Sequence, residues 1–112
     1  MPFRIGCDIV SIHRFRERIS ESGESFLERV FQPHEQRGAS LERLAGLFAA
    51  KEAVCKALCL RAGSWLQIGV THEFSGSPRI ELSEPQPGLQ DLHLSISHAG
   101  EYAVAVALAT FK

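Results

Sequence analysis

Apolar and polar residues alternate with a period of two in five stretches of the chain, and this alternation predicts β-strands. The stretches cover residues 3–10, 66–74, 79–82, 92–98 and 103–109. A Gly-Ser-Pro segment at 76–78 predicts a turn between the second and third strands, and residues 99–101 predict a hairpin connection between the last two. The proline-rich segment 83–90 is expected to be a loop.

Two short helices and one long helix are predicted between the first two strands. The first short helix covers residues 12–20, and the second begins at Ser25 and ends before Pro33. The long helix runs from Leu41 to about Leu60, with Ser40 as its N-cap. It is apolar nearly all the way round, and such a helix is buried on most sides.

The final strand indicates where the long helix packs. One face carries Val104, Val106 and Leu108, whereas the other carries only alanine. A face of small side chains lets a helix approach the sheet closely. We therefore predict one α+β domain over residues 1–112, in which a mostly antiparallel sheet packs against the long buried helix.

Charge and composition narrow the class of protein. The chain has 12 Lys+Arg and 13 Asp+Glu, so the net charge of −1 does not indicate a nucleic-acid-binding surface. The first residues lack the basic and apolar regions of a signal peptide. The most apolar stretch, 102–111, is too short to span a bilayer. We expect a cytoplasmic protein with neither nucleic acid nor membrane as a partner.

The three cysteines lie in apolar sequence and are expected to be reduced and buried. Cys55 and Cys59 are four apart on the long helix, which raises the alternative of a zinc site. No nearby cysteine or histidine completes a ligand set, so the buried-thiol interpretation is preferred over zinc for Cys7, Cys55 and Cys59.

Three charges interrupt the long apolar helix at Lys51, Glu52 and Lys56. Glu52 and Lys56 are four apart and therefore neighbours, and the simplest interpretation is an exposed ion pair. A mostly buried helix has little surface for such a pair, however, and buried charges need partners or a polar cleft. This favours a functional site.

Asp8 is the second unusual charge, since the alternation places it opposite the apolar side chains of its strand. If this strand packs on the long helix, Asp8 and Glu52 could meet, and two carboxylates sharing a site repel unless a cation joins them. Mg²⁺ suits this arrangement because it binds one or two carboxylates together with phosphate oxygens and waters. Lys56 would add a positive charge beside the same phosphates.

These residues stand in motifs that resemble the holo-acyl-carrier-protein synthase family, the small single-domain phosphopantetheinyl transferases. The motifs occur in the family's order and at its spacing, and the resemblance covers almost the whole chain. They are Gly6-Cys7-Asp8-Ile9-Val10, the Phe48–Ala57 segment FAAKEAVCKA, and Ser95-Ile96-Ser97-His98 followed by Glu101-Tyr102-Ala103; Phe26–Phe31 and Glu35 also fit.

The resemblance implies that Asp8 and Glu52 bind Mg²⁺, which also holds the pyrophosphate of coenzyme A. It implies that Lys56 contacts the phosphates near the bond to be broken, and that Lys51 and His98 lie in the coenzyme pocket. A serine of the carrier protein would attack the β-phosphate and displace adenosine 3′,5′-bisphosphate. Either Glu52 or a metal-bound water would accept the serine proton.

A basic stretch on the first helix, with Arg14, Arg16 and Arg18, is most simply a solvated face. In the resembling family this helix docks the acidic helix of the acyl carrier protein, and Arg14 fits the docking position, with Arg18 beside it. The family's small members are homotrimers, so a homotrimer with sites at its interfaces is implied. Physics alone would favour a dimer.

The chain also departs from the family pattern. The family usually has arginine where Leu47 stands, lysine where Ser77 stands, and Gly-Thr-Gly in place of residues 59–61. In the family, Leu47 and the altered turn lie near the coenzyme A and substrate sites, so the resemblance leaves substrate preference and catalytic efficiency open but not the metal pair. Two alternatives therefore stay open: a non-catalytic binding module for coenzyme A or the carrier, and a Mg²⁺-dependent nucleotide phosphohydrolase. The carrier could serve fatty acid, polyketide or other synthesis.

Overall fold

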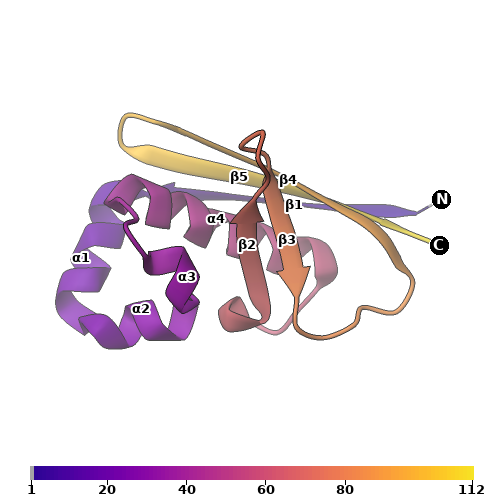
Figure 1. Cartoon of the computed structure of the whole chain (residues 1–112), viewed down its shortest axis with the longest axis horizontal. Helices are drawn as coiled ribbons and strands as arrows, with labels where there is room; N and C mark the ends of the chain where they lie inside the picture. The colour runs from indigo at the N-terminus through magenta and orange to yellow at the C-terminus, as the bar shows by residue number, and fades with distance from the viewer. Residues whose placement is uncertain (1) are drawn as a thin grey trace.

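The computed structural model describes residues 2–112 and confirms the predicted α+β class. A three-stranded antiparallel sheet has the order β1-β5-β4, and β2 and β3 form a separate antiparallel hairpin. Figure 1 shows the three short helices gathered at one end of the molecule and both chain termini at the other. The elements are β1 (Phe3–Ser11), α1 (Ile12–Ser22), α2 (Glu24–Val30), α3 (Pro33–Gln36), α4 (Leu41–Leu58), the 3₁₀ turn η1 (Trp65–Gln67), β2 (Ile68–His72), β3 (Pro78–Leu82), β4 (Leu89–Ala99) and β5 (Tyr102–Phe111).

Most element boundaries lie close to their predicted positions. The Ser40 hydroxyl accepts a hydrogen bond from the Arg43 amide at 3.1 Å, so Ser40 caps α4 as expected. The helix ends two residues before the predicted Leu60, because Cys59 takes a left-handed conformation with φ 55°. Ser25 does not cap α2; its hydroxyl donates to the Ser22 carbonyl oxygen instead.

The close contact of α4 with the alanine face of β5 is confirmed. Four alanines of β5 are completely buried beneath the helix. On β1, a Cβ at Gly6 would overlap the Ala53 carbonyl oxygen and would lie 2.8 Å from the Ala57 amide nitrogen. Only glycine therefore lets the backbones of β1 and α4 approach to this distance. The alanines are Ala103, Ala105, Ala107 and Ala109.

The opposite face of the sheet carries large apolar side chains that no element within residues 2–112 covers. Phe3, Ile5 and Ile9 of β1 are 68%, 65% and 63% exposed. The register of β1 against β5 places Ile5 beside Leu108 and Ile9 beside Val104. We call this surface, formed by alternate residues of β1 and β5, the outer sheet face. Exposed apolar patches of this kind mark contact surfaces.

The prediction for the cysteines is only partly right. All three are free thiols and Cys55 is buried, where burial raises its pKa. Cys7 and Cys59 are exposed, so their predicted burial is wrong. Cys7 points to the outer sheet face, and Cys59 lies beyond the end of α4. None of the helices within residues 2–112 combines the length and apolar character needed to cross a bilayer.

Candidate active site

Asp8 and Glu52 line one cavity of about 260 Å³ between β1, α1 and α4. Asp8 follows Gly6 on the strand face that meets α4, and the close approach at Gly6 brings the carboxylate to the helix. Glu52 precedes Ala53, the residue that Gly6 touches. The close approach of β1 and α4 is therefore the structural reason that both residues line one cavity. The cavity is lined by Asp8, Ile9, Val10, Ser11, Arg14, Phe15, Arg18, Phe48 and Glu52.

Lys56 reaches this site from one turn further along α4. Its Nζ lies 3.2 Å from Asp8 Oδ1 and donates to the Cys7 carbonyl oxygen at 2.8 Å. The simple prediction of a Glu52–Lys56 ion pair is wrong for the described residues 2–112, where the ion pair of Lys56 is with Asp8. The lysine side chain is 55% exposed and the aspartate 19%, so a ligand can reach this pair.

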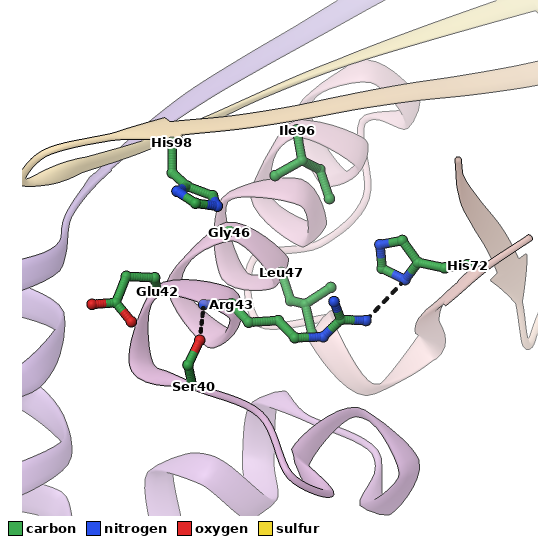
Figure 2. A pocket seen from close by; sticks show the side chains of 8 residues that line it. All are labelled: Ser40, Glu42, Arg43, Gly46, Leu47, His72, Ile96 and His98. Atoms are coloured by element: carbon green, nitrogen blue, oxygen red, sulfur yellow. Dashed lines mark hydrogen bonds between the residues drawn. The ribbon is translucent and has the colours of Figure 1, made fainter. Parts of the chain in front are cut away.

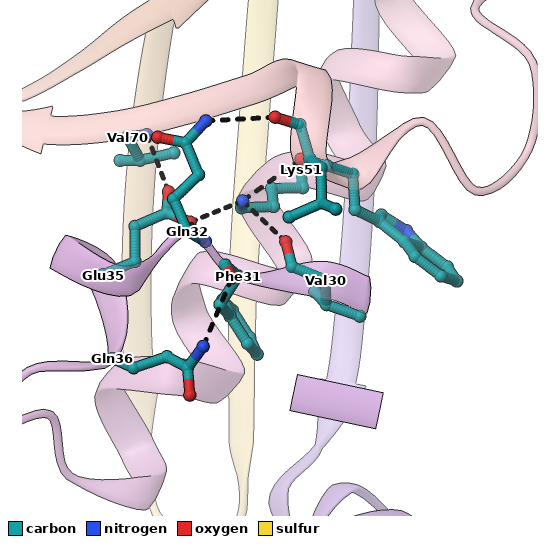
Figure 3. A network of polar contacts seen from close by, with 9 residues as sticks. Val30, Phe31, Gln32, Glu35, Gln36, Lys51 and Val70 are labelled. Atoms are coloured by element: carbon teal, nitrogen blue, oxygen red, sulfur yellow. Dashed lines mark hydrogen bonds and ion pairs between the residues drawn. The ribbon is translucent and has the colours of Figure 1, made fainter. Parts of the chain in front are cut away.

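Lys51 lies elsewhere, and its assignment to the coenzyme pocket is corrected. Its side chain is fully buried. Its Nζ donates to Glu35 Oε1 at 2.6 Å, to the Val30 carbonyl oxygen at 2.8 Å and to the Trp65 carbonyl oxygen at 3.1 Å (Figure 3). Three acceptors use all three protons of an ammonium group, which leaves no donor for a ligand.

Glu35 fits the family pattern, but the sequence did not reveal that it is the partner of Lys51. Both of its oxygens are used: Oε1 accepts from Lys51 and from the Gln32 amide, and Oε2 accepts from the Val70 amide at 2.8 Å (Figure 3). Burial lowers the pKa of Lys51, while the Glu35 carboxylate acts in the opposite direction. The sequence offers one signal for this pair: Glu35 lies two residues after Pro33, which can begin a helix, and 16 positions before Lys51 of the apolar helix.

His98 lines a second pocket, on the β4 side of α4, with a volume of about 500 Å³. Leu47 lines the same pocket, and Figure 2 shows His98 and Ile96 extending from β4 toward α4. The structure thus does not bring His98 to Asp8 and Glu52 within one chain. β1, which carries Asp8, and β4, which carries His98, are the two edges of the sheet.

The arginines of α1 have different environments. Arg14 and Arg18 both line the Asp8–Glu52 cavity. The Arg18 guanidinium lies over the Phe26 ring at 4.4 Å and over the Phe48 ring at 5.8 Å, which are cation–π distances. Arg14 has no such aromatic partner in the described chain, and Arg16 is exposed. Arg14 is therefore the freer of the two cavity arginines.

The donor set fits a magnesium ion. Residues 2–112 contain no group of three or more Asp, Glu, His or Cys side chains that would hold a metal by themselves. Two carboxylates in an open cavity match Mg²⁺, which keeps several waters and takes its remaining ligands from phosphates. Asp8 and Glu52 supply these two carboxylates.

Comparisons with known proteins agree with this geometry. Residues 4–107 match the model of the 4′-phosphopantetheinyl transferase superfamily. The holo-[acyl-carrier-protein] synthase of Protochlamydia amoebophila is 39% identical over 119 residues, covering 96% of this chain and 98% of the relative. The synthase of Caldanaerobacter subterraneus subsp. tengcongensis is 34% identical over 122 residues, covering 97% and 95%.

Two solved structures share the fold. The holo-[acyl-carrier-protein] synthase of Helicobacter pylori, in complex with coenzyme A, superposes with a TM-score of 0.87 at 35% identity, covering 95% of this chain and 99% of that one. The coenzyme A complex of the Chronobacterium ammoniagenes enzyme also gives 0.87, at 33% identity and coverages of 100% and 99%. Since the family model and the relatives extend over nearly the whole chain, this protein belongs to the 4′-phosphopantetheinyl transferase superfamily and, within it, to the holo-acyl-carrier-protein synthase enzymes.

Proposed function

We propose that this chain transfers the phosphopantetheine arm of coenzyme A to a serine of an apo acyl carrier protein, with Mg²⁺, and releases adenosine 3′,5′-bisphosphate. The observation that carries the proposal is the open cavity that Asp8 and Glu52 line together, with the half-exposed Lys56 paired to Asp8 beside it. Relatives that match nearly the whole chain have been solved in complex with coenzyme A, which supports this substrate.

Asp8 and Glu52 would hold the metal. When bound, Mg²⁺ neutralises charge on the pyrophosphate oxygens of the coenzyme and fixes their position. Asp8 is paired with Lys56 through Oδ1 in this structure, and the ammonium would move from the carboxylate if a cation took its place. That movement would free Lys56 to donate to a phosphate oxygen.

The reaction forms a bond between the carrier serine oxygen and the β-phosphorus, and breaks the bond from that phosphorus to the bridging oxygen. The leaving oxygen carries its electron pair away on adenosine 3′,5′-bisphosphate. Lys56 would stabilise the negative charge that develops on these oxygens. Glu52 is the cavity carboxylate without a lysine partner among the described ion pairs, which supports it as acceptor of the serine proton.

The carrier protein would dock on α1, next to the cavity. Arg14 is exposed and also lines the Asp8–Glu52 cavity, so an acidic segment bound there would bring its serine close to the carboxylates. Charge reversal at Arg14 should raise the KM for the carrier much more than the KM for coenzyme A. An equal rise in both values would indicate a role in folding instead.

A homotrimer with shared sites is the proposed assembly. The outer sheet face offers an apolar contact surface, and the Asp8 cavity and the His98 pocket lie at opposite edges of the sheet. In such an assembly, the His98 pocket of one chain could lie against the Asp8 cavity of its neighbour and complete that site. Sedimentation in dilute solution tests this, because a fully active monomer would contradict it. We further propose a cytoplasmic location, in keeping with three free thiols.

One assay tests the reaction itself. The chain is incubated with Mg²⁺, coenzyme A and an apo carrier protein, and the carrier is weighed by mass spectrometry. Transfer adds the mass of phosphopantetheine; a non-catalytic binder adds nothing, and a phosphohydrolase consumes coenzyme A without modifying the carrier. Asp8→Asn and Glu52→Gln should each abolish Mg²⁺-dependent transfer with the fold intact. Near-normal turnover in both variants would exclude the two-carboxylate site.

A further inference from the structure

Three charged side chains follow one another along the exposed side of α1, leading away from the cavity of the candidate active site. Arg14, Arg18 and Glu21 are spaced four and three residues apart, so they lie on one face of the helix. All three are exposed, and the two arginines line the cavity. We call these three residues the α1 charge row. It begins with a cation beside the cavity and ends with an anion.

The order of these charges opposes the helix dipole. A helix favours anions in its first turn and cations in its last turn. Within Ile12–Ser22, the first turn of α1 has no acidic residue and the last turn has no basic residue. Arg14 lies in the first turn instead, and Glu21 lies in the last. The charge row therefore costs α1 stability, and helix formation does not explain it.

Contacts within the chain do not explain the charge row either. None of the ion pairs formed within residues 2–112 includes Arg14, Arg18 or Glu21. Arg18 is held over the Phe26 ring at 4.4 Å by a cation–π contact. Arg14 and Glu21 keep their charges in solvent. The two ends of the row are thus a cation and an anion that a partner can reach.

The ends of the charge row also set a distance for that partner. Glu21 follows Arg14 by seven residues, which at 1.5 Å per residue is about 10 Å along the helix axis. A helical segment lying beside α1 has its own residues seven apart on one face, about two turns from each other. A matching segment therefore carries an acidic residue opposite Arg14 and a basic residue about two turns further, opposite Glu21.

We propose that α1 selects carrier proteins whose docking segment is acidic next to the modified serine and basic about two turns further, and that Glu21 recognises the basic position. This inference rests on the proposed function, which places the carrier beside the cavity at Arg14. A segment with acidic residues at both positions would meet Glu21 with repulsion, and like charges that face each other disfavour a wrong partner.

The opposite charges at the two ends also fix the direction of the carrier segment on α1. A segment bound in reverse would place its basic residue against Arg14 and its acidic residue against Glu21. Both contacts would then be repulsive. The correct direction brings the acidic end, with its serine, to the end of α1 that lines the cavity.

The test uses two apo carrier proteins that differ at one position. One has glutamate and the other has lysine two turns beyond the acidic residue next to the serine. The parent chain should transfer to the lysine carrier with a kcat/KM about fivefold higher, which corresponds to about 1 kcal/mol. Glu21→Lys should reverse this preference. The KM for coenzyme A should stay within about twofold of the parent value.

Glu84→Lys is the matched control. It makes the same change of charge in the exposed loop between β3 and β4, at the opposite end of the molecule from α1 (Figure 1). It should leave the preference for the lysine carrier unchanged. Glu21→Lys places a cation in the last turn of α1, which the helix dipole favours, so the thermal midpoint of unfolding should not fall. Neither unfolding nor net charge would then explain a reversed preference.

Three results would overturn the proposal. They are the same preference in the parent and in Glu21→Lys, a parent preference for the glutamate carrier, and a changed sedimentation of Glu21→Lys, which would place a neighbouring copy against α1. Calorimetric binding of serine-to-alanine forms of both carriers, without coenzyme A, separates this inference from the reaction. A preference that Glu21→Lys reverses would support the charge row in a chain that fails to transfer. Equal transfer to both carriers would support the proposed function and exclude the selectivity.

Discussion

Two lysines on one helix, five residues apart, form ion pairs of opposite character. Lys51 and Glu35 are both completely buried, and their atoms also bond the carbonyl groups of Val30 and Trp65 and the amides of Gln32 and Val70. Lys56 and Asp8 are 55% and 19% exposed, and within residues 2–112 the Cys7 carbonyl oxygen is the one further group that bonds this pair. The buried pair has no free ammonium proton for a ligand and no access to solvent, whereas the exposed pair can be reached by a ligand.

The difference in burial between the two ion pairs indicates which one can take part in ligand binding. A buried pair is satisfied only by fixed protein groups, so breaking it leaves an isolated charge in the interior. An exposed pair contributes little to stability. Its carboxylate can bind a metal in place of the ammonium, and its ammonium can bind a phosphate in place of the carboxylate. Lys51 therefore serves the fold, where it ties α4 to α3 and η1, whereas Lys56 has the exposure that its proposed role in the reaction requires.

The largest expected effect is the loss of stability in Lys51→Met. Removing the ammonium leaves the buried Glu35 carboxylate without its cation, and the free energy of unfolding should fall by about 3–5 kcal/mol. Urea denaturation followed by the fluorescence of the single tryptophan, Trp65, measures it. Lys56→Met is the matched control and should lose no more than about 1 kcal/mol. Similar losses of stability in the two variants would contradict the different roles of the two lysines.

Lys56→Met should instead reduce transfer. Loss of one cation at the developing charge should lower kcat by about 10²–10³-fold. The same change removes a competitor for Asp8, so Mg²⁺ should bind the coenzyme-free protein more tightly than it binds the parent. Turnover assays and calorimetry with Mg²⁺ alone measure the two effects. Weaker metal binding in the variant would indicate that Lys56 positions Asp8 and does not compete for it.

A smaller change in the free energy of unfolding is expected when two substitutions are combined at the buried Lys51–Glu35 pair. Adding Glu35→Gln to Lys51→Met removes the uncompensated charge and retains an acceptor for a backbone amide. The double variant should regain about 1–2 kcal/mol of the stability lost by Lys51→Met. Urea denaturation again gives the value. No recovery would mean that the carboxylate is already protonated, or solvated, in the single variant.

The smallest effect is that of ionic strength on the coupling energies of the two ion pairs, Lys56–Asp8 and Lys51–Glu35. Raising ionic strength from 0.1 M to 1 M shortens the screening length from about 10 Å to 3 Å. Double-mutant cycles should show the Lys56–Asp8 coupling falling by a few tenths of a kcal/mol, because solvent reaches that pair. The Lys51–Glu35 coupling should stay constant. A salt-sensitive buried pair would indicate that water enters the site.

The sequence by itself determined the elements and much of the site. The strands, the capped α4 and the alanine face of β5 were predicted because side-chain periodicity and capping are local properties. The placement of Asp8 and Glu52 at one cavity was also within reach of the sequence, since it required only that β1 pack on α4. Gly6 explains that packing once the backbone contact is known.

Only the tertiary structure decided which partner each charge has. Sequence spacing favoured Glu52 for Lys56, yet the lysine pairs with Asp8, 48 positions away, because the close contact of β1 and α4 brings that carboxylate nearer. Lys51 was expected to face a ligand, but packing of α3 and η1 encloses it with Glu35. Arg43 and His72 meet for the same reason. Periodicity gives the direction of a side chain on its own element, whereas the groups it meets depend on how distant elements pack.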